Sequence, residues 1–302
     1  MSLILSAPRM SILQKHQQLF SVSAVIIACV MLAGMDAIGK YLQQSLPALQ
    51  VVWGRYFFHF LLFIIAALIL HKQRQLLHPK RPVLQFIRGV LLLGVTINFY
   101  IAIREVSLAD ASAVLFTSPV LVTLFAALLL KEHLSRKKMA AVMLGFIGVL
   151  IIIQPGSAVF NPKILLAAVS AASLAGYFIL TRYLSRHDHV ITTIFYSPVA
   201  GTLILSIMLP WVWVMPDWQE FLWLFSMGVI GAAGHYLLTW AFHHADASLL
   251  SPLLNSQLVA AAFFSAWIFS DQLDIMFYLG TALIIIASML VSRPPRRKTD
   301  TL

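Results

Sequence analysis

The sequence predicts an all-α integral membrane protein of ten transmembrane helices, arranged as two five-helix repeats of opposite orientation. Three observations predict this class. First, 60% of the 302 residues are hydrophobic and only 11% are charged, whereas roughly a quarter of the residues in soluble domains are charged. Second, the apolar residues form ten long runs separated by short polar joints. Third, short matches in one order relate the first five runs to the last five.

The apolar runs have the length of membrane-spanning helices, because crossing the hydrocarbon core takes about 20 predominantly apolar residues. Turn-forming residues such as Pro155-Gly156 mark the joints between them. Prolines inside three runs, Pro119, Pro198 and Pro252, are expected to interrupt the helices. The expected spans are residues 20–42, 48–70, 83–104, 110–130, 138–154, 162–184, 190–214, 221–242, 248–269 and 275–291.

The net charge of +10 indicates orientation. If the N-terminus is cytoplasmic, all but four of the 21 basic residues fall on the cytoplasmic side, and Arg88 is counted there. Because this asymmetry is typical of the positive-inside rule, we expect both termini in the cytoplasm of a bacterial inner membrane. It also argues against nucleic acid as a partner. Residues 1–19, which lack a signal-peptide cleavage site, and the basic tail 292–302 are expected to be cytoplasmic. The four basic residues that do not fall on the cytoplasmic side are Lys40, Arg55, Arg104 and Lys163.

Internal similarity divides the chain into two repeats, residues 20–156 and 157–291. Each repeat holds five spans, and an odd number forces the second copy to insert upside down. Two halves that can exchange conformations provide the inward-open and outward-open states that alternating access requires. The matched segments are 32–34 with 174–176, 40–42 with 182–184, 109–112 with 245–248, and 131–134 with 270–273.

With these repeats, the chain resembles the drug/metabolite transporter superfamily, in its EamA-type branch. The marks are an Ala-Ser step near the start of the fourth and ninth spans, Pro119, and an acidic residue that follows each of these spans, Glu132 and Asp271. The chain departs from the usual pattern at Asp271, where glutamate is common, and at Leu258, where proline is common. The resemblance implies a central cavity lined by spans one, three, four, six, eight and nine. It also implies transport of a small polar or amphipathic metabolite, such as an amino acid, vitamin, nucleotide derivative or drug-like solute.

Charged side chains inside spans are costly and therefore mark candidate sites. Asp36 lies about 9 Å below the outer end of the first span, and Arg55 about 10 Å below the start of the second. Matching depth on consecutive antiparallel helices predicts that they pair, with His59 one turn from Arg55 on the same face. Their counterparts in the second repeat are Phe178 and Ser197, so the pair breaks the internal symmetry, as a substrate or proton site in one half would. An ion pair that only fixes two helices is an equal alternative.

The other candidates for substrate contact are hydrogen-bonding and aromatic residues inside the spans. Such groups on apolar walls suit a planar or amphipathic solute, although hydrogen bonding between helices explains any single one as well. The lone Cys29 has no partner for a metal site, and the clusters at 187–189 and 243–246 would need three or four converging ligands to bind one. Hydrated histidines at the membrane surface are the favoured interpretation, so no metal or cofactor is expected. The candidates are Asn98, Tyr100, Tyr177, His235, Tyr236, Trp240, Asn255 and Gln257.

These features predict a secondary transporter that works by alternating access. The sequence has no glycine-rich phosphate loop, so ATP is not expected to be the direct energy source. Proton coupling through Asp36 and uncoupled uniport are both open, as are import and export, and monomer and homodimer. The expected partners are a small-molecule substrate and the lipid bilayer. The alternatives are an intramembrane enzyme acting on lipid, which would need converging acid–base or metal groups that the sequence does not show, and a non-transporting scaffold or receptor.

Overall fold

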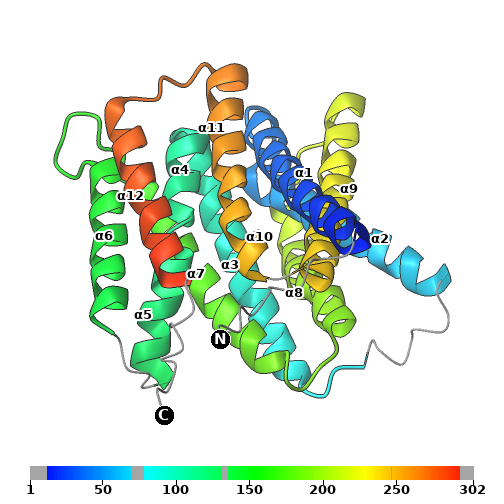
Figure 1. Ribbon diagram of the computed structural model, residues 1–302. Helices are drawn as coiled ribbons and strands as arrows, with labels where there is room; N and C mark the ends of the chain where they lie inside the picture. Colours follow the sequence, from blue (N-terminus) through cyan, green and yellow to red (C-terminus); the bar gives the residue numbers. More distant parts are fainter. Residues whose placement is uncertain (1–11, 70–77, 131–134, 246, 293–302) are drawn as a thin grey trace, which may run out of the picture.

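The computed structural model describes residues 12–69, 78–130, 135–245 and 247–292. Within these residues all regular structure is helical (Figure 1). The helices of the first half are α1 (Ile12–Leu42), α2 (Ala48–Ile69), α3 (Pro82–Glu105), α4 (Leu108–Leu115), α5 (Ser118–Leu130) and α6 (Arg136–Ile153). Those of the second half are α7 (Ile164–Leu184), α8 (Val190–Met208), η2 (Leu209–Trp211), α9 (Trp218–His244), α10 (Ala247–Leu250), η3 (Ser251–Asn255), α11 (Ser256–Phe269) and α12 (Ile275–Ser292).

The surface of the helices is strongly apolar. Among the described residues, seven helical segments are long and apolar enough to cross a membrane, and Leu253–Phe269 and Ile275–Leu290 are shorter apolar helices. Large hydrophobic side chains face outward, for example Trp267, which is 70% exposed, and Leu128, which is 67% exposed. Lipid tolerates such a surface, whereas water does not. The chain is therefore an all-α, multi-pass membrane protein.

Proline explains where an expected span is divided. The fourth span breaks into α4 and α5 just before Pro119, and the ninth breaks into α10, η3 and α11, with Pro252 at the start of η3. Proline removes a helical N–H donor and disfavours the α conformation in the residue before it. The expected interruption at Pro198 is wrong, because α8 continues through this residue. Pro198 is buried, and neighbouring helices hold the helix together although one backbone hydrogen bond is missing.

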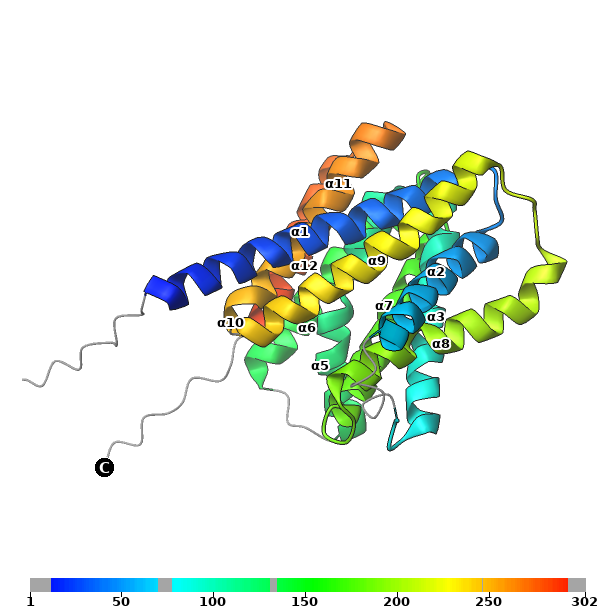
Figure 2. The same cartoon turned by 90° about the vertical axis from the view of Figure 1, so that its right-hand side faces the viewer.

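Helix packing repeats between the two halves. α1 packs along α9 and α11, and α7 packs along α3 and α5 in the same way. α2 contacts α8 and α9, while α8 contacts α2 and α3. Figure 1 shows α6 beside α12, and Figure 2 shows α1 running along α9. Exchanging corresponding helices of the two halves turns each of these contacts into another contact of the same set. The corresponding pairs are α1 with α7, α2 with α8, α3 with α9, α5 with α11 and α6 with α12.

Glycine permits the closest helix approaches. A Cβ added at Gly148 of α6 would lie 2.8 Å from the carbonyl oxygen of Gly280 in α12. A Cβ at Gly228 of α9 would lie 3.0 Å from the backbone nitrogen of His59 in α2. Small residues at helix crossings are typical of membrane interiors. The Gly228 contact brings α9 against α2 beside His59 and so helps to position the polar groups described next.

Candidate functional site

A buried polar trio joins α1, α2 and α3. Arg55 Nη1 donates a hydrogen bond to Asp36 Oδ1 at 3.2 Å, and the Tyr100 hydroxyl donates to the same oxygen at 3.2 Å. Asp36 is 8% exposed and Tyr100 is fully buried. The ring of Tyr100 fits because Gly39, one turn from Asp36, has no side chain in its way. The pairing that the sequence predicted for Asp36 and Arg55 is thus present, and Tyr100 is its third member.

Two histidines extend the trio towards α9. His59 lies one turn from Arg55 in α2, and its ring stacks on that of His235 in α9 with 5.8 Å between centroids. His59 Nε2 is buried and has no hydrogen-bond partner among the residues that the structure describes. His235 is within electrostatic range of both Arg55 and Arg88. The two stacked imidazoles therefore connect the trio on α1, α2 and α3 with α9.

Arg88 forms the second arginine site, which the sequence analysis missed. Its side chain lies between α7 and α8, and the residue is only 3% exposed. Nε donates to Thr181 Oγ1 at 2.6 Å, and Nη1 donates to the Thr193 carbonyl at 2.9 Å and to Ser197 Oγ at 3.1 Å. Nη2 donates to the hydroxyl of Tyr177, whose ring centroid lies 4.3 Å from the guanidinium carbon. Arg88 was counted only as an orientation signal, because it lies near the start of α3, six residues after Pro82.

Asp188 closes the end of this second site. Its Oδ1 accepts the backbone N–H of Lys80 at 2.7 Å, and its Oδ2 accepts Nε2 of Gln85 at 2.8 Å. The same Gln85 nitrogen also reaches Thr193 Oγ1 at 3.2 Å. Asp188 is therefore 7% exposed, although the sequence places it in a loop. Its neighbours fix the joint between α7 and α8 against the start of α3.

The remaining sequence candidates do not meet these two sites. Asn98 donates to the Gly94 carbonyl of its own helix at 2.8 Å. Trp240 stacks on His244 with 4.2 Å between centroids, near the end of α9. Tyr236 is 67% exposed, and no polar contact joins it to either site among the described residues.

Asn255 and Gln257 lie where α11 begins. Cys29 Sγ in α1 reaches the backbone carbonyl of neighbouring Leu254 at 3.8 Å, and Cys29 is two helical turns before Asp36. These two candidates therefore lie near Cys29 in the α1–α11 contact, about two helical turns along α1 from Asp36. A role in substrate contact stays a prediction for them.

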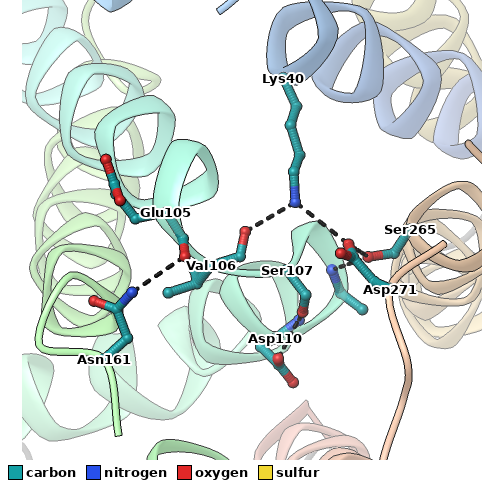
Figure 3. Close-up of polar contacts among 9 residues, drawn as sticks. Lys40, Glu105, Val106, Ser107, Asp110, Asn161, Ser265 and Asp271 are labelled. Atoms are coloured by element: carbon teal, nitrogen blue, oxygen red, sulfur yellow. Dashed lines mark hydrogen bonds and ion pairs between the residues drawn. The ribbon is translucent and has the colours of Figure 1, made fainter. Parts of the chain in front are cut away.

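A third polar cluster joins the two halves where α3 ends (Figure 3). Lys40 Nζ lies 3.3 Å from Asp271 Oδ2 and donates to the Val106 carbonyl at 2.9 Å. Ser265 Oγ donates to the same carboxylate oxygen at 2.6 Å and accepts the Ala109 N–H at 3.2 Å. The end of α1, the joint between α3 and α4, and the end of α11 are therefore held together.

Comparison with known proteins identifies the family. The family model described as "EamA-like transporter family" matches the chain twice, over residues 19–154 and 161–293. The chain belongs to the EamA-like transporter family. It is thus a member of the drug/metabolite transporter superfamily, as the sequence resemblance implied.

Two kinds of named transporter are similar to this EamA protein over nearly its whole length. The S-adenosylmethionine uptake transporter of Rickettsia felis is 25% identical over 266 residues, which is 88% of this chain and 90% of that protein. The pseudopaline exporter CntI of Pseudomonas aeruginosa UCBPP-PA14 is 28% identical over 272 residues, covering 89% and 94% respectively. A solved crystal structure with a TM-score of 0.62 and 18% identity covers 90% of this chain and 96% of that one, and shows the same fold.

Proposed function

We propose that this EamA-family protein is a secondary transporter that moves a small polar or amphipathic metabolite across a bacterial inner membrane by alternating access. The observation that carries the proposal is the buried trio of Asp36, Arg55 and Tyr100 inside a bundle whose outer surface is apolar. Ionisable groups at such depth are expensive and typically lie on solute or ion pathways. Membership of a transporter family agrees with this role.

The proposed architecture has ten crossings in two inverted five-helix repeats, with both termini in the cytoplasm. Counting α4 with α5, and α10 and η3 with α11, yields ten spans. The exchange of helix contacts between the halves supports the inverted repeat, as do the two separate family matches. The ends of α1 and α11 then lie on the outer side, and the start of α3 on the inner side.

The proposed transport cycle opens the two sides in turn. The Lys40–Asp271 ion pair links the first half to the second at the proposed outer end, so we assign the described conformation as closed on that side. Opening towards the outside requires that this pair separate. The energy comes from the gradient of the solute or from protons that exchange at Asp36.

The proposed substrate is a metabolite of the size that the named relatives carry. One set of relatives is named for uptake of S-adenosylmethionine and another for export of pseudopaline, so the direction of transport differs within the family. S-adenosylmethionine is the first solute to test, and a panel of amino acids, vitamins and nucleotide derivatives should accompany it.

Flux into and out of proteoliposomes tests the proposal. We expect wild-type protein to move at least one solute of the panel, and Asp36→Asn to lower its initial rate at least about tenfold, because it removes the charge that holds Arg55. Asp217→Asn is the matched control, since Asp217 is an exposed N-cap of α9 and asparagine caps equally well. A wild-type protein that moves no solute would argue against transport. A wild-type rate in Asp36→Asn would remove Asp36 from the mechanism.

A further inference from the structure

Arg88 carries a buried positive charge that is hydrogen-bonded but electrically unbalanced. Within the described part of the chain, ion pairs join Lys40 to Asp271 and Arg55 to Asp36, whereas Arg88 has no such partner. Its hydrogen-bond acceptors are neutral hydroxyls and one carbonyl. A buried charge is costly inside a membrane protein even when it is hydrogen-bonded, and such residues typically mark solute or ion pathways.

Asp188 does not balance this charge. Both of its carboxylate oxygens bind other groups, Oδ1 the backbone N–H of Lys80 and Oδ2 the side-chain amide of Gln85. Among the described contacts, Asp188 is connected to Arg88 only through Gln85 and Thr193, because the Gln85 amide also binds the Thr193 hydroxyl while Arg88 binds the Thr193 carbonyl. The carboxylate therefore holds the α7–α8 joint in place and leaves the guanidinium without an ionic partner.

The donors that remain at this site point to an anion. The hydroxyl hydrogens of Thr181 and Ser197 are used, because they bond to the carbonyls of Tyr177 and Thr193 at 2.7 Å and 2.9 Å. The Tyr177 hydroxyl accepts from Arg88, so its own hydrogen can still be donated. Arginine has five N–H donors, and one on Nη2 is left over after the four bonds described. Two donors and a full positive charge suit a carboxylate.

The position of Arg88 in the two halves agrees with a substrate role. Ser197 is the sequence counterpart of Arg55, and Tyr177 precedes Phe178, the counterpart of Asp36. Arg88 of the first half thus contacts, in the second half, the counterpart of Arg55 and the neighbour of the counterpart of Asp36. The central region therefore has one balanced pair and one unbalanced cation, with His235 within range of both arginines.

We propose that Arg88, together with the Tyr177 hydroxyl, binds a carboxylate of the transported metabolite. The proposal rests on the transport function proposed above and adds the chemical class of the group recognised. When α7 or α8 moves during the cycle, the carboxylate enters beside Arg88 and its negative charge balances the guanidinium.

The test is direct binding to the full-length protein in detergent, measured by calorimetry with a ligand pair that differs in one group. S-adenosylmethionine has the carboxylate, and decarboxylated S-adenosylmethionine lacks it. We expect wild type to prefer the first by about tenfold or more, as for a charge-assisted hydrogen bond. Arg88→Gln should bind the two ligands equally. Arg88→Lys keeps the charge without the planar fork, so its preference for the carboxylate ligand should lie between those of wild type and Arg88→Gln. Arg104→Gln is the matched control, because Arg104 is exposed at the other end of the same helix.

Each result decides the proposal. A wild type that binds both ligands equally, or neither, overturns it, as does a folded Arg88→Gln that keeps the preference. Size exclusion and thermal melting show whether Arg88→Gln is folded. If it is not, Arg88→Lys takes its place, and a preference as strong as that of wild type in Arg88→Lys overturns the proposal. The flux assay separates the two proposals. Binding that depends on Arg88 without any solute flux removes the transport function only, whereas flux without carboxylate dependence removes this inference only.

Discussion

The carboxylate of Asp36 binds two groups through one oxygen, and the loss of each should have a different consequence. Arg55 supplies a compensating charge to Oδ1, whereas Tyr100 supplies a neutral hydroxyl to the same atom. An uncompensated charge inside a membrane protein is a larger penalty than a missing neutral donor. Loss of the charge pair between Asp36 and Arg55 should therefore impair transport more than loss of the Tyr100 hydroxyl.

Tyr100→Phe should slow transport about three- to tenfold, less than Asp36→Asn, because the ion pair survives while one hydrogen bond to a charged group is lost. Initial rates in proteoliposomes measure this difference. Tyr278→Phe is the matched control, since Tyr278 is 56% exposed on α12. A Tyr100→Phe variant that folds but transports as poorly as Asp36→Asn would contradict the ranking.

Sequence reasoning found one arginine site and missed the other. Asp36 and Arg55 lie deep in consecutive spans, so their depth alone predicted that they pair. Arg88 lies near the end of a span, where a long side chain can equally reach the membrane surface. Only the packing of α7 and α8 around α3 shows that it points inward. For Tyr236, which is 67% exposed, a role in substrate contact stays a prediction.

At the scale of elements, the Lys40–Asp271 pair joins the ends of α1 and α11. The two side chains are 13% and 23% exposed, so solvent screens the pair only in part. Lys40 also contacts the Phe269 ring with 4.8 Å to its centroid. The pair therefore stabilises the conformation in which these helix ends are together.

Reversal of one charge, in Lys40→Asp or Asp271→Lys, should lower the transport rate about three- to tenfold, because like charges then repel at the helix ends. The double variant should recover part of the loss, since it restores an opposite pair. Initial flux rates of the four proteins form a double-mutant cycle. Additive losses with no recovery would show that the ion pair itself has no part in transport.

The helices themselves were largely predictable, because an apolar run of spanning length has few alternatives to a helix in lipid. Proline was the least reliable signal. Pro119 and Pro252 coincide with breaks, but α8 continues through Pro198. Local sequence shows which backbone hydrogen bond is lost, whereas the surrounding helices decide whether the helix survives the loss.

At the scale of the whole molecule, the two halves exchange their contacts when the corresponding helices are interchanged. The repeat and the odd number of spans per half predicted an inverted arrangement, which this packing supports. Two residues that break the symmetry, Asp36 and Arg55, have no charged counterparts at the matched positions 178 and 197. Symmetry is therefore the basis of the motion that we propose, and its exceptions are the residues for which we propose a role in recognition.

The central claim is that opening one end of the molecule closes the other. Distances between paired spin labels test it directly, in a Cys29→Ala background that has no other cysteine. Gln44 with Gln272 reports on the end that holds Lys40 and Asp271, and Ser135 with Ser185 reports on the opposite end; all four are exposed. Asp271→Asn weakens the Lys40 contact without any need for a substrate.

We predict that Asp271→Asn lengthens the Gln44–Gln272 distance and shortens the Ser135–Ser185 distance in the same sample. A lengthened Gln44–Gln272 distance with an unchanged or longer Ser135–Ser185 distance would contradict alternating access.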